Sequence, residues 1–549
     1  VMPMARTPLL SRFQQLVAGF KEADRSGLSV EAVQAARHKL SRRDFLKVTG
    51  ATVGAAALTG SLPVFARAAA PRIAIIGGGI AGLNAALTLQ DAGIASTIYE
   101  ASGRVGGRMH SDTTSWLNGQ TSEDCGELID TGHTTILALA QRFNLTTVNL
   151  HEAEPPGSTE TYFFGHRYYS AAQANTDFQP VFDRLTADYN AALYPTLYNS
   201  FTEAGKDLDH MTVYQWIESR VRGGHASKMG QLLDVAYNIE YGNVTTEQSA
   251  LNLVYLLFNN TNQFVVFGAS DETYHIMGGN ELLPRAIAAT LPPGSVKLDN
   301  KLTGIVHNPN NTYRLTFDTP HGSVDKTVDR VIMTIPFSVL RTILRTDADF
   351  RAAGFTALKQ TAITRLGYGK NCKLQLQFDT RYWDQPGPWG LSTGTSYSDT
   401  DYQNTWDVTR AQNGATGILV DYTGGGVPLA SFAGDPNDPA LVAQFAKTFL
   451  RQIEPVFPGI SRHWNGRATL DVPRIEPFLL GSYSYWKTGQ YTLFSGYEGA
   501  RQPDIKTGKC HFAGEHCSTN FQGFMEGGAE EGARAANEIL SDYNAGIFP

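Results

Sequence analysis

The sequence is short of the features that mark several functional classes. Its 549 residues include only four cysteines, Cys125, Cys372, Cys510 and Cys517, which are too few and too scattered for a disulfide framework or a paired CxxC metal site. We expect mostly free thiols, with a bridge between Cys510 and Cys517 as the alternative. The formal net charge is −7 and no basic run is longer than Arg42-Arg43, so we do not expect nucleic acid or an anionic membrane surface as a partner.

Spacings for metal-dependent hydrolysis and for nucleophilic catalysis are absent as well. The chain has no HExxH or other metal-ligand spacing and no Ser/His/Asp order, so we expect no metal site. The scattered histidines, His275, His463 and His516 among them, are expected to be structural or to lie beside a cofactor. With 42% hydrophobic residues the chain can bury large cores, and its length suggests two to four domains.

The first seventy residues differ in character from the rest. The segment Ser41–Lys47, SRRDFLK, closely resembles the twin-arginine export signal, and a weakly apolar stretch over Val48–Leu62 and a cleavage-like Ala66-Arg67-Ala68 follow it. Glycines and threonines make the apolar stretch a poor membrane-spanning helix, so we expect no stable membrane insertion. The pattern predicts a leader over residues 1–70 and a periplasmic or secreted protein; a retained N-terminal helical arm is the alternative.

What the sequence does contain is a complete dinucleotide-binding unit. The apolar run Ile73–Ile76 predicts a buried parallel strand, and GxGxxG follows it directly. In this motif Gly77 permits the tight turn, Gly79 admits a pyrophosphate, and Gly82 allows the next helix to pack on the sheet. That helix, expected over 81–92, directs the positive end of its dipole at the phosphates. Its first residues, Ile80 and Ala81, are expected to contact the cofactor.

An acidic residue completes the unit at the end of the second strand. The strand expected over Ser96–Tyr99 leads into Glu100, about twenty residues past the glycines, where a carboxylate accepts hydrogen bonds from the ribose hydroxyls. A carboxylate at this place disfavours a 2′-phosphate, which argues against NADP. Ala101 lies beside it and is included in the expected cofactor site.

The continuation Arg104-Val105-Gly106-Gly107-Arg108 resembles the RxGGR motif of the FAD-dependent amine oxidase family. The resemblance implies that Arg104, Gly106, Gly107 and Arg108 lie along the pyrophosphate and the flavin. Two arginines beside two glycines also offer charge and close backbone approach to an anion. FAD is therefore the expected cofactor.

A second match lies near the end of the chain. The segments His511–His516, HFAGEH, and Gly523–Ala529, GFMEGGA, resemble the family's closing motif, FAG(E/D) and then GxMEGA before a helix. The resemblance adds five residues to the FAD site: Gly514, Glu515, Gly523, Phe524 and Met525. We expect the helix after Gly527 to direct its N-terminus at the edge of the isoalloxazine ring where negative charge accumulates on reduction.

Two further matches lie between the ends. The segment 277–298 resembles the family's GG turn, helix and VKL strand, in which the backbone of Val296 contacts the adenine side of FAD. The segment Arg365–Lys373 resembles the strand that carries the family's active-site lysine, which holds a water near flavin N5. Lys373 is the candidate for this role, and the nearby Lys370 competes with it.

The segment Arg474–Tyr485 resembles the third wall of the family's active site in relatives that bind flavin non-covalently. Relatives with covalently attached flavin carry a cysteine close to the position of Ser482, so the resemblance implies FAD that is bound but not bonded. Tyr483 and Phe524 match positions that form an aromatic sandwich facing the flavin in amine-specific relatives. Lys373, Tyr483 and Phe524 are therefore the expected catalytic residues.

The fold class expected is α/β with α+β insertions. We expect a Rossmann-like FAD-binding domain of the glutathione-reductase-like, amine oxidase type, together with a discontinuous substrate-binding domain of antiparallel sheet plus helices. The FAD-binding domain is assigned to residues 71–147, 272–345 and 476–549. The substrate-binding domain is assigned to 148–271, its helical part, and to 346–475, its sheet part.

The layout is similar to bacterial secreted flavin amine oxidases, which include L-amino acid oxidases. The function implied is oxidative deamination of an L-amino acid to a 2-oxo acid, ammonia and hydrogen peroxide, by hydride transfer to FAD N5 and reoxidation by O2. Better-known L-amino acid oxidases have a carboxylate-binding arginine two residues after the position of Glu127, where this chain has Ile129; Arg474 is the substitute we consider. The first alternative is a primary-amine or polyamine oxidase.

Further alternatives are an amide-forming amino-acid monooxygenase, an FAD-dependent isomerase or desaturase, and a cofactor-binding protein without a redox role. The lysine strand and the GFMEGG match argue against the isomerase or desaturase, because the relatives of that kind usually differ at both places. Expected partners are a small-molecule amino acid or amine and O2, with a homodimer as a possible assembly.

Overall fold

A computed structural model describes residues 71–268 and 270–547, which belong to one compact unit. The leader or N-terminal arm predicted for residues 1–70 lies outside the described residues.

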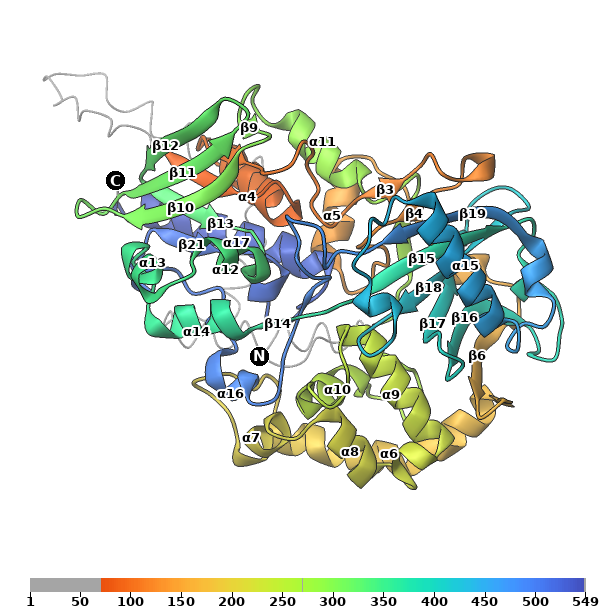
Figure 1. Cartoon of the computed structure of the whole chain (residues 1–549). Helices are drawn as coiled ribbons and strands as arrows, with labels where there is room; N and C mark the ends of the chain where they lie inside the picture. Colours follow the sequence, from red (N-terminus) through yellow and green to blue (C-terminus); the bar gives the residue numbers. More distant parts are fainter. Residues whose placement is uncertain (1–70, 269, 548–549) are drawn as a thin grey trace, which may run out of the picture. The chain divides into compact units, whose positions relative to one another are not determined.

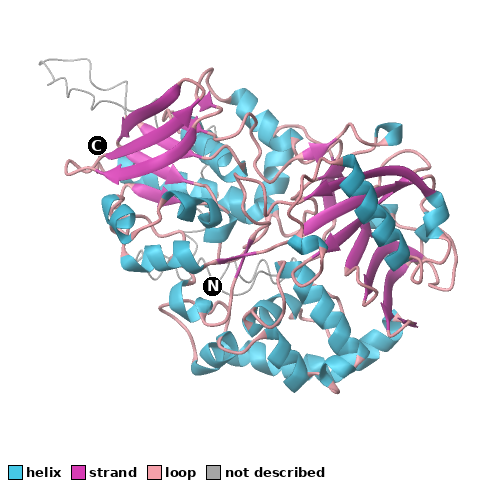
Figure 2. Ribbon diagram, in the orientation of Figure 1, coloured by secondary structure: helices cyan, strands magenta, loops and turns pink. Residues whose placement is uncertain are grey.

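The strand that precedes the glycine turn belongs to a five-stranded parallel sheet (Figures 1 and 2). β1 (Ile73–Ile76) lies at its centre, with all four side chains buried because both faces of the sheet are covered. The strand order is β21-β13-β1-β2-β9. The other strands are β2 (Thr97–Tyr99), β9 (Val296–Lys297), β13 (Arg330–Met333) and β21 (Cys510–Phe512). This arrangement confirms the α/β class expected from the glycine motif.

Two helices at opposite ends of the sequence pack closely beside this sheet. They are α4 (Ile80–Asp91) and α17 (Met525–Asn544), which begins at Met525 rather than after Gly527 as expected. A Cβ on Gly532 would lie 2.1 Å from the carbonyl oxygen of Ala81, so α17 approaches α4 more closely than any side chain permits. Gly82 has the packing role predicted for it, because a Cβ there would lie 2.0 Å from the carbonyl oxygen of Gly77.

Other elements extend this part of the molecule. A three-stranded antiparallel sheet lies between β9 and β13 in the sequence, and several helices accompany it. The strands are β10 (Lys301–His307), β11 (Tyr313–Thr319) and β12 (Gly322–Val328). The helices are α5 (Thr134–Arg142), α11 (Leu282–Thr290), α12 (Phe337–Ile343), α13 (Asp347–Ala352) and α14 (Ala357–Arg365).

A seven-stranded sheet forms the second large layer, in the order β19-β15-β18-β17-β16-β6-β7. Its neighbours pair antiparallel except β16 and β6, which are parallel. The strands are β6 (Thr159–Phe164), β7 (Arg167–Tyr169), β15 (Cys372–Phe378), β16 (Ser392–Ser398), β17 (Asn404–Asp407), β18 (Gly417–Thr423) and β19 (Trp464–Asp471). Figure 1 shows α15 (Pro439–Ile453) lying across this sheet, where its apolar face packs on β15 and β19.

A group of helices with its own apolar core lies beside the seven-stranded sheet (Figure 1). It consists of α6 (Ala171–Ala192), α7 (Glu203–Asp209), α8 (Val213–Arg220), α9 (Lys228–Tyr241) and α10 (Ala250–Leu257), with α16 (Gln490–Phe494) against α7. Short strand pairs join these layers. They are β3 (Ser111–Asp112) with β4 (Ser122–Glu123), β5 (Thr147–Asn149) with β8 (Tyr274–Ile276), and β14 (Gly367–Tyr368) with β20 (Ser484–Tyr485).

The two large sheets draw on different segments of the chain. Strands of the five-stranded sheet come from each of the three segments assigned to the FAD-binding domain, and those of the seven-stranded sheet come from the other two segments. The domain boundaries themselves stay a prediction.

The same described residues show the state of the cysteines, the apolar character of the helices and the grouping of possible metal ligands. All four cysteines are free, so the alternative of a Cys510–Cys517 bridge was wrong. Within residues 71–268 and 270–547, no helix is both long and apolar enough to span a membrane. Within the same residues, no group of three or more histidine, cysteine or acidic side chains is arranged to hold a metal ion.

Substituting Gly532→Ala tests the close approach of α17 to α4. We expect it to lower the free energy of unfolding by about 1–3 kcal/mol, because overpacking outweighs the roughly 1 kcal/mol by which alanine favours a helix. Thermal unfolding of the FAD-loaded protein measures the change. Asn537→Ala, at an exposed position of the same helix, is the matched control and should shift stability by no more than about 0.5 kcal/mol. Equal behaviour of the two variants would contradict the packing argument.

Candidate active site

The predicted site segments meet around one cavity of about 1420 Å³. This volume exceeds the roughly 300–1,000 Å³ of ordinary small-molecule sites, and it is large enough for an extended cofactor together with a substrate. Its walls come from the glycine turn after β1, the segment after β2, the loop after β4, strands of the seven-stranded sheet, and the segment before α17.

The glycine turn presents open backbone to the cavity. Gly77 adopts φ of +110°, and Gly79 lies against the backbone of Gly106 through a parallel bridge. A Cβ on Gly79 would have no neighbour closer than 4.0 Å, so the space in front of it is empty. Gly79 caps α4 without a side-chain hydrogen bond, and Ile80 and Ala81 line the cavity. The first N–H groups of α4 are therefore free to bind an anion there.

The carboxylate of Glu100 lies beside this turn and is held in place from two sides. Oε2 accepts from the backbone N–H of Gly78 at 2.6 Å, and Oε1 accepts from the N–H and hydroxyl of Ser102 at 2.8 and 2.7 Å. Both Glu100 and Ala101 line the cavity at the end of β2. A fixed carboxylate at this place is what recognition of a ribose requires.

An ion pair between the partly buried Arg108 and the buried Glu515 joins the RxGGR turn to the closing motif. Nη1 of Arg108 donates to Oε1 of Glu515 at 2.9 Å and to the main-chain oxygen of Ser482 at 2.8 Å. Burial raises the pKa of Glu515, but the charge of Arg108 and the hydrogen bonds from Ser484 and Arg108 act in the opposite direction, and the net result is a pKa below the usual range. Oε2 of Glu515 also accepts from the hydroxyl of Ser484 and the N–H of Gly523.

The N-terminus of α17 forms the opposite wall. Phe524 is its N-cap and makes no side-chain capping bond, and Phe524 and Met525 both line the cavity, as do Gly514 and Gly523. Arg104, Gly106 and Gly107 line it from the side of the glycine turn. Two helix N-termini, those of α4 and α17, thus meet one cavity.

Two predicted cofactor residues do not line this cavity. Gly82 lies one turn inside α4, where its missing side chain serves the packing described above. Val296 lies in β9 at the edge of the five-stranded sheet, next to Ile98, and the cavity extends instead to Asn300, Lys301 and Leu302.

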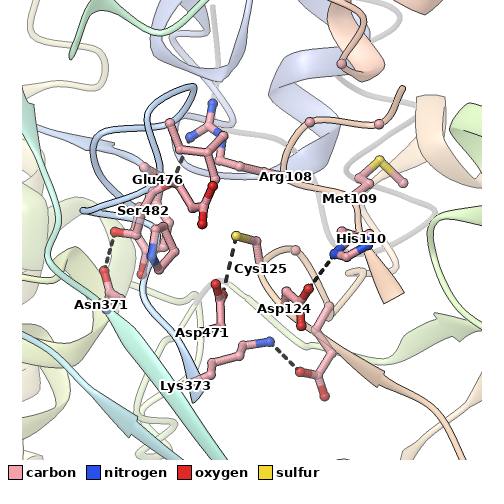
Figure 3. A pocket seen from close by; sticks show the side chains of 18 of the residues that line it. Arg108, Met109, His110, Asp124, Cys125, Asn371, Lys373, Asp471, Glu476 and Ser482 are labelled. Carbon is pink, nitrogen blue, oxygen red and sulfur yellow. Dashed lines mark hydrogen bonds and ion pairs between the residues drawn. The ribbon is translucent and has the colours of Figure 1, made fainter. Parts of the chain in front are cut away.

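Of the two candidate lysines, only Lys373 reaches the cavity. It is 4% exposed on β15, whereas Lys370 is exposed and does not line the cavity. Nζ of Lys373 donates to Oε2 of Glu127 at 2.6 Å, and Oε1 of Glu127 accepts from the indole N–H of Trp406 at 2.8 Å. Figure 3 shows Lys373 directed toward the segment that carries Asp124.

A second polar group lies next to Lys373. Asp471 on β19 is directly opposite Lys373 in the antiparallel register, and its Oδ2 lies 3.6 Å from Sγ of Cys125 (Figure 3). Burial and the nearby charge of Asp124 raise the pKa of Asp471 well above its usual range. Asp124 in turn makes a short contact with His110. We therefore expect Asp471 to hold a proton when the cavity is empty.

The predicted aromatic pair lies on the same cavity. Tyr483 and Phe524 both line it, and the hydroxyl of Tyr483 donates to the main-chain oxygen of Glu240. The Tyr422 hydroxyl lies 3.0 Å from that of Tyr483 and adds an aromatic ring from β18. Gly523 allows Tyr483 to approach, since a Cβ there would lie 3.3 Å from its ring.

The sequence motifs did not reveal several charged residues of the cavity. Glu240 at the end of α9 and Glu272 before β8 both line it, and neither side chain has a hydrogen-bond or ion-pair partner within the described part of the chain. Burial raises the pKa of Glu272 to about 8, and burial with the charge of Glu272 raises that of Glu240 well above its usual range. Arg410 also lines the cavity and donates to Glu154 at 2.9 Å.

Other residues that the sequence singled out lie elsewhere. Arg474 does not line the cavity and donates to the main-chain oxygen of Phe432, so it is not placed to bind a substrate carboxylate. Nε2 of His275 lies 2.8 Å from Glu123, which makes this histidine structural. His516 is buried behind Glu515, and burial lowers its pKa to about 3, so it is neutral.

The residues present fit an FAD molecule. The open backbone at Gly79 and the uncapped start of α4 suit a pyrophosphate, and Glu100 suits a ribose. The start of α17 suits the flavin edge that accumulates negative charge.

Comparisons with known proteins agree with this geometry. The profile of the twin-arginine translocation pathway signal sequence matches residues 39–59, so the protein is exported to the periplasm or secreted. A putative L-amino-acid oxidase of Bacillus subtilis (strain 168) is 26% identical over 496 residues, covering 85% of this chain and 94% of that protein. Polyamine oxidase 2 of Arabidopsis thaliana is 25% identical over 497 residues, covering 85% and 88%.

Among solved structures, cyclohexylamine oxidase from Brevibacterium oxydans IH-35A has a TM-score of 0.71 at 20% identity, covering 86% of this chain and 99% of that one. Wild-type putrescine oxidase bound to putrescine has a TM-score of 0.69 at 18% identity, with the same coverage. These likenesses show the fold. The profile of flavin containing amine oxidoreductases matches residues 80–540. The chain therefore belongs to the flavin-containing amine oxidoreductase family, whose cofactor is FAD, typically bound without a covalent bond.

Proposed function

We propose that this FAD-dependent amine oxidoreductase oxidises an amine that carries a second positive charge, a diamine or polyamine, with O2 as the electron acceptor. The observation that carries the proposal is the pair of carboxyl groups, Glu240 and Glu272, which line the cavity without partners among the described residues.

These two groups favour a cationic ligand for a physical reason. An isolated buried carboxyl group keeps its proton, because burial disfavours the charged form, and this raises the pKa of Glu272 to about 8. An ammonium group beside it stabilises the carboxylate through a charge-assisted hydrogen bond. An apolar or anionic part of a substrate cannot form this charge-assisted hydrogen bond. The second ammonium group of a diamine can, and this is a reason for two acids to face the cavity.

The cations on the sheet side of the cavity argue against a substrate carboxylate. Lys373 is paired with Glu127, and Arg410 is paired with Glu154. A substrate carboxylate would have to compete with these partners. These pairings therefore favour the first alternative, a primary-amine or polyamine oxidase, over the L-amino acid oxidase expected from the overall layout.

L-Amino acid oxidation is the second candidate. Arg410 uses Nη1 for Glu154 and Nε for the main-chain oxygen of Asp407, and Nη2 has no partner among the described residues. That remaining group is suited to a carboxylate oxygen. A basic L-amino acid would use both Arg410 and the acid pair.

The reaction needs few contributions from the protein. When bound, FAD takes up a hydride equivalent from the carbon beside the amine and passes the electrons to O2. Tyr483 and Phe524, which line the cavity, orient the amine, and Lys373 holds a proton at Nζ. The predicted cofactor residues from Gly77 to Arg108 and from Gly514 to Met525 hold the dinucleotide.

Matched substrate pairs test the preference. Mixed anaerobically with the enzyme, putrescine should bleach the flavin absorbance more efficiently than butylamine, and L-lysine more efficiently than L-norleucine. A charge-assisted hydrogen bond contributes about 1.5–3 kcal/mol, so we expect differences of roughly ten- to hundredfold. Bleaching by L-norleucine but not by putrescine would support the second candidate. No bleaching by any of the four compounds would refute amine oxidation.

The variant Glu272→Gln tests the acid pair directly. In the wild type, the ratio of kcat/KM for putrescine to that for butylamine should rise with pH through about 8, because Glu272 must lose its proton to bind the second ammonium. The ratio cancels the deprotonation of the reacting amine, which both substrates share. Glu272→Gln should lower the ratio and flatten its rise. A variant with the wild-type pH profile of this ratio would exclude Glu272 from substrate binding.

The variant Lys373→Met tests the proposed lysine. We expect it to retain FAD, as measured by absorbance, and to slow turnover or reoxidation on the order of a hundredfold, because the proton-holding group is lost. Lys370→Met is the matched control, since Lys370 is exposed and lies outside the cavity. Wild-type kinetics in Lys373→Met would remove this residue from the active site.

A further inference from the structure

Glu127 has no counterpart in the motifs that identify the family, yet it contacts the proposed active-site lysine. We propose that Glu127 is a positioning residue that keeps Lys373 as an ammonium and leaves one of its N–H groups for the cavity. The inference rests on the proposed role of Lys373 and does not depend on which amine is the substrate.

The hydrogen bonds of Lys373 leave one donor over. An ammonium has three N–H groups. One donates to Oε2 of Glu127 at 2.6 Å and another to the main-chain oxygen of Glu123 at 3.1 Å. Lys373 lines the cavity, and the third N–H has no partner within the described part of the chain. It is therefore available to a molecule in the cavity.

Glu127 is itself fixed, so it fixes the lysine. Its second oxygen accepts from the indole N–H of Trp406, and Nζ of Lys373 lies 5.5 Å from the centre of the Trp406 ring. The three side chains form a closed triangle. They come from the loop after β4, from β15 and from β17, which are far apart in the sequence. Each side chain of the triangle is held by the other two, which restricts the position of Nζ.

The charge state of Lys373 depends on this partner. Both ionised side chains are buried, with Lys373 4% and Glu127 7% exposed. Burial lowers the pKa of a lysine, but the charge of Glu127 and its hydrogen bond, the two largest opposing effects, contribute most to a net rise in the pKa of Lys373. The other titratable groups that face Lys373 come from four elements: Glu123 on β4, Cys125 after it, Tyr422 on β18 and Asp471 on β19. Burial and the charge of Asp124 raise the pKa of Asp471 well above its usual range, which favours its neutral form, and the carboxylate that contacts Nζ is that of Glu127.

This arrangement makes Lys373 a fixed positive charge and proton donor rather than a base. With Glu127 in place, Nζ keeps its proton at neutral and moderately alkaline pH. Without the carboxylate, burial dominates, and Nζ loses its proton at a lower pH. The role assigned to Glu127 is thus visible as a change of pH dependence, which a merely structural role would not produce.

Reoxidation of the reduced flavin reports on this charge without any substrate. We propose reducing the FAD-loaded enzyme with dithionite, mixing it with O2 between about pH 6 and 10, and following the flavin absorbance. Glu127→Gln should show a new midpoint, above which the rate falls by roughly tenfold per pH unit, because only the protonated lysine assists. The wild type should lack this midpoint in that range.

Two controls make the result specific. Glu127→Asp keeps a negative charge beside Lys373 and should therefore lack the new midpoint, even where the shorter side chain slows the reaction as a whole. Glu154→Gln removes a carboxylate from the other ion pair at the cavity, that of Arg410, and should not introduce the midpoint. A Glu127→Gln profile identical to that of the wild type would overturn the proposal, as would the same new midpoint in Glu154→Gln.

Thermal unfolding provides a second measurement should Glu127→Gln retain too little FAD. Glu127→Gln and Lys373→Met should each lower the melting temperature, since each leaves one buried charged or polar group without its partner. The double variant should lose less than the sum of the two. Additive losses would show that the two residues do not act as a pair. Neither experiment uses an amine, so the proposal can stand even when the diamine preference fails.

Discussion

The site depends on the ion pair between the partly buried Arg108 and the buried Glu515, which joins two segments that are 407 residues apart. Arg108 also binds the main-chain oxygen of Ser482, and Glu515 binds Ser484 and Gly523. This one pair therefore fixes the RxGGR turn, the third wall and the start of α17 relative to one another. Such a pair is costly to form, because Glu515 loses most of its hydration and Arg108 loses part of its own. The additional hydrogen bonds to both partners offset that cost and hold the walls in a single arrangement.

The sequence predicted best those features that short spacings determine. The strand before the glycine turn, the helix α4 and the carboxylate at the end of β2 each follow from the fixed spacing of the dinucleotide-binding motif. The closing motif was also recognisable, although α17 begins two residues before Gly527. Val296 shows the limit of motif reasoning, because it lies in the strand expected but away from the cavity. Gly82 has the packing role that the motif predicts, although it does not line the cavity.

Glu240 and Glu272 could not be predicted, because neither belongs to a motif with a characteristic spacing in the sequence. Glu240 ends a helix, Glu272 precedes a short strand, and the two meet only through the packing of helices beside the seven-stranded sheet. Arg474 shows the opposite error, since an arginine close to a motif in sequence was considered for substrate binding and instead binds the main chain of Phe432. For Glu127 the sequence did offer a signal that this segment faces the substrate. It stands two residues before the position where better-known L-amino acid oxidases have an arginine and this chain has none.

The charges around the cavity follow a consistent pattern. Each cation that lines it on the sheet side has a fixed carboxylate partner, whereas Glu240 and Glu272 have none among the described residues. A buried site with paired cations and unpaired acids gains most from a ligand that brings positive charge, because the ligand ionises acids that burial otherwise keeps neutral. The same pairing keeps Lys373 charged without making it a binding site for a carboxylate. On the proposals made above, one arrangement of charges separates the acid pair, which attracts the substrate, from Lys373, which holds the proton.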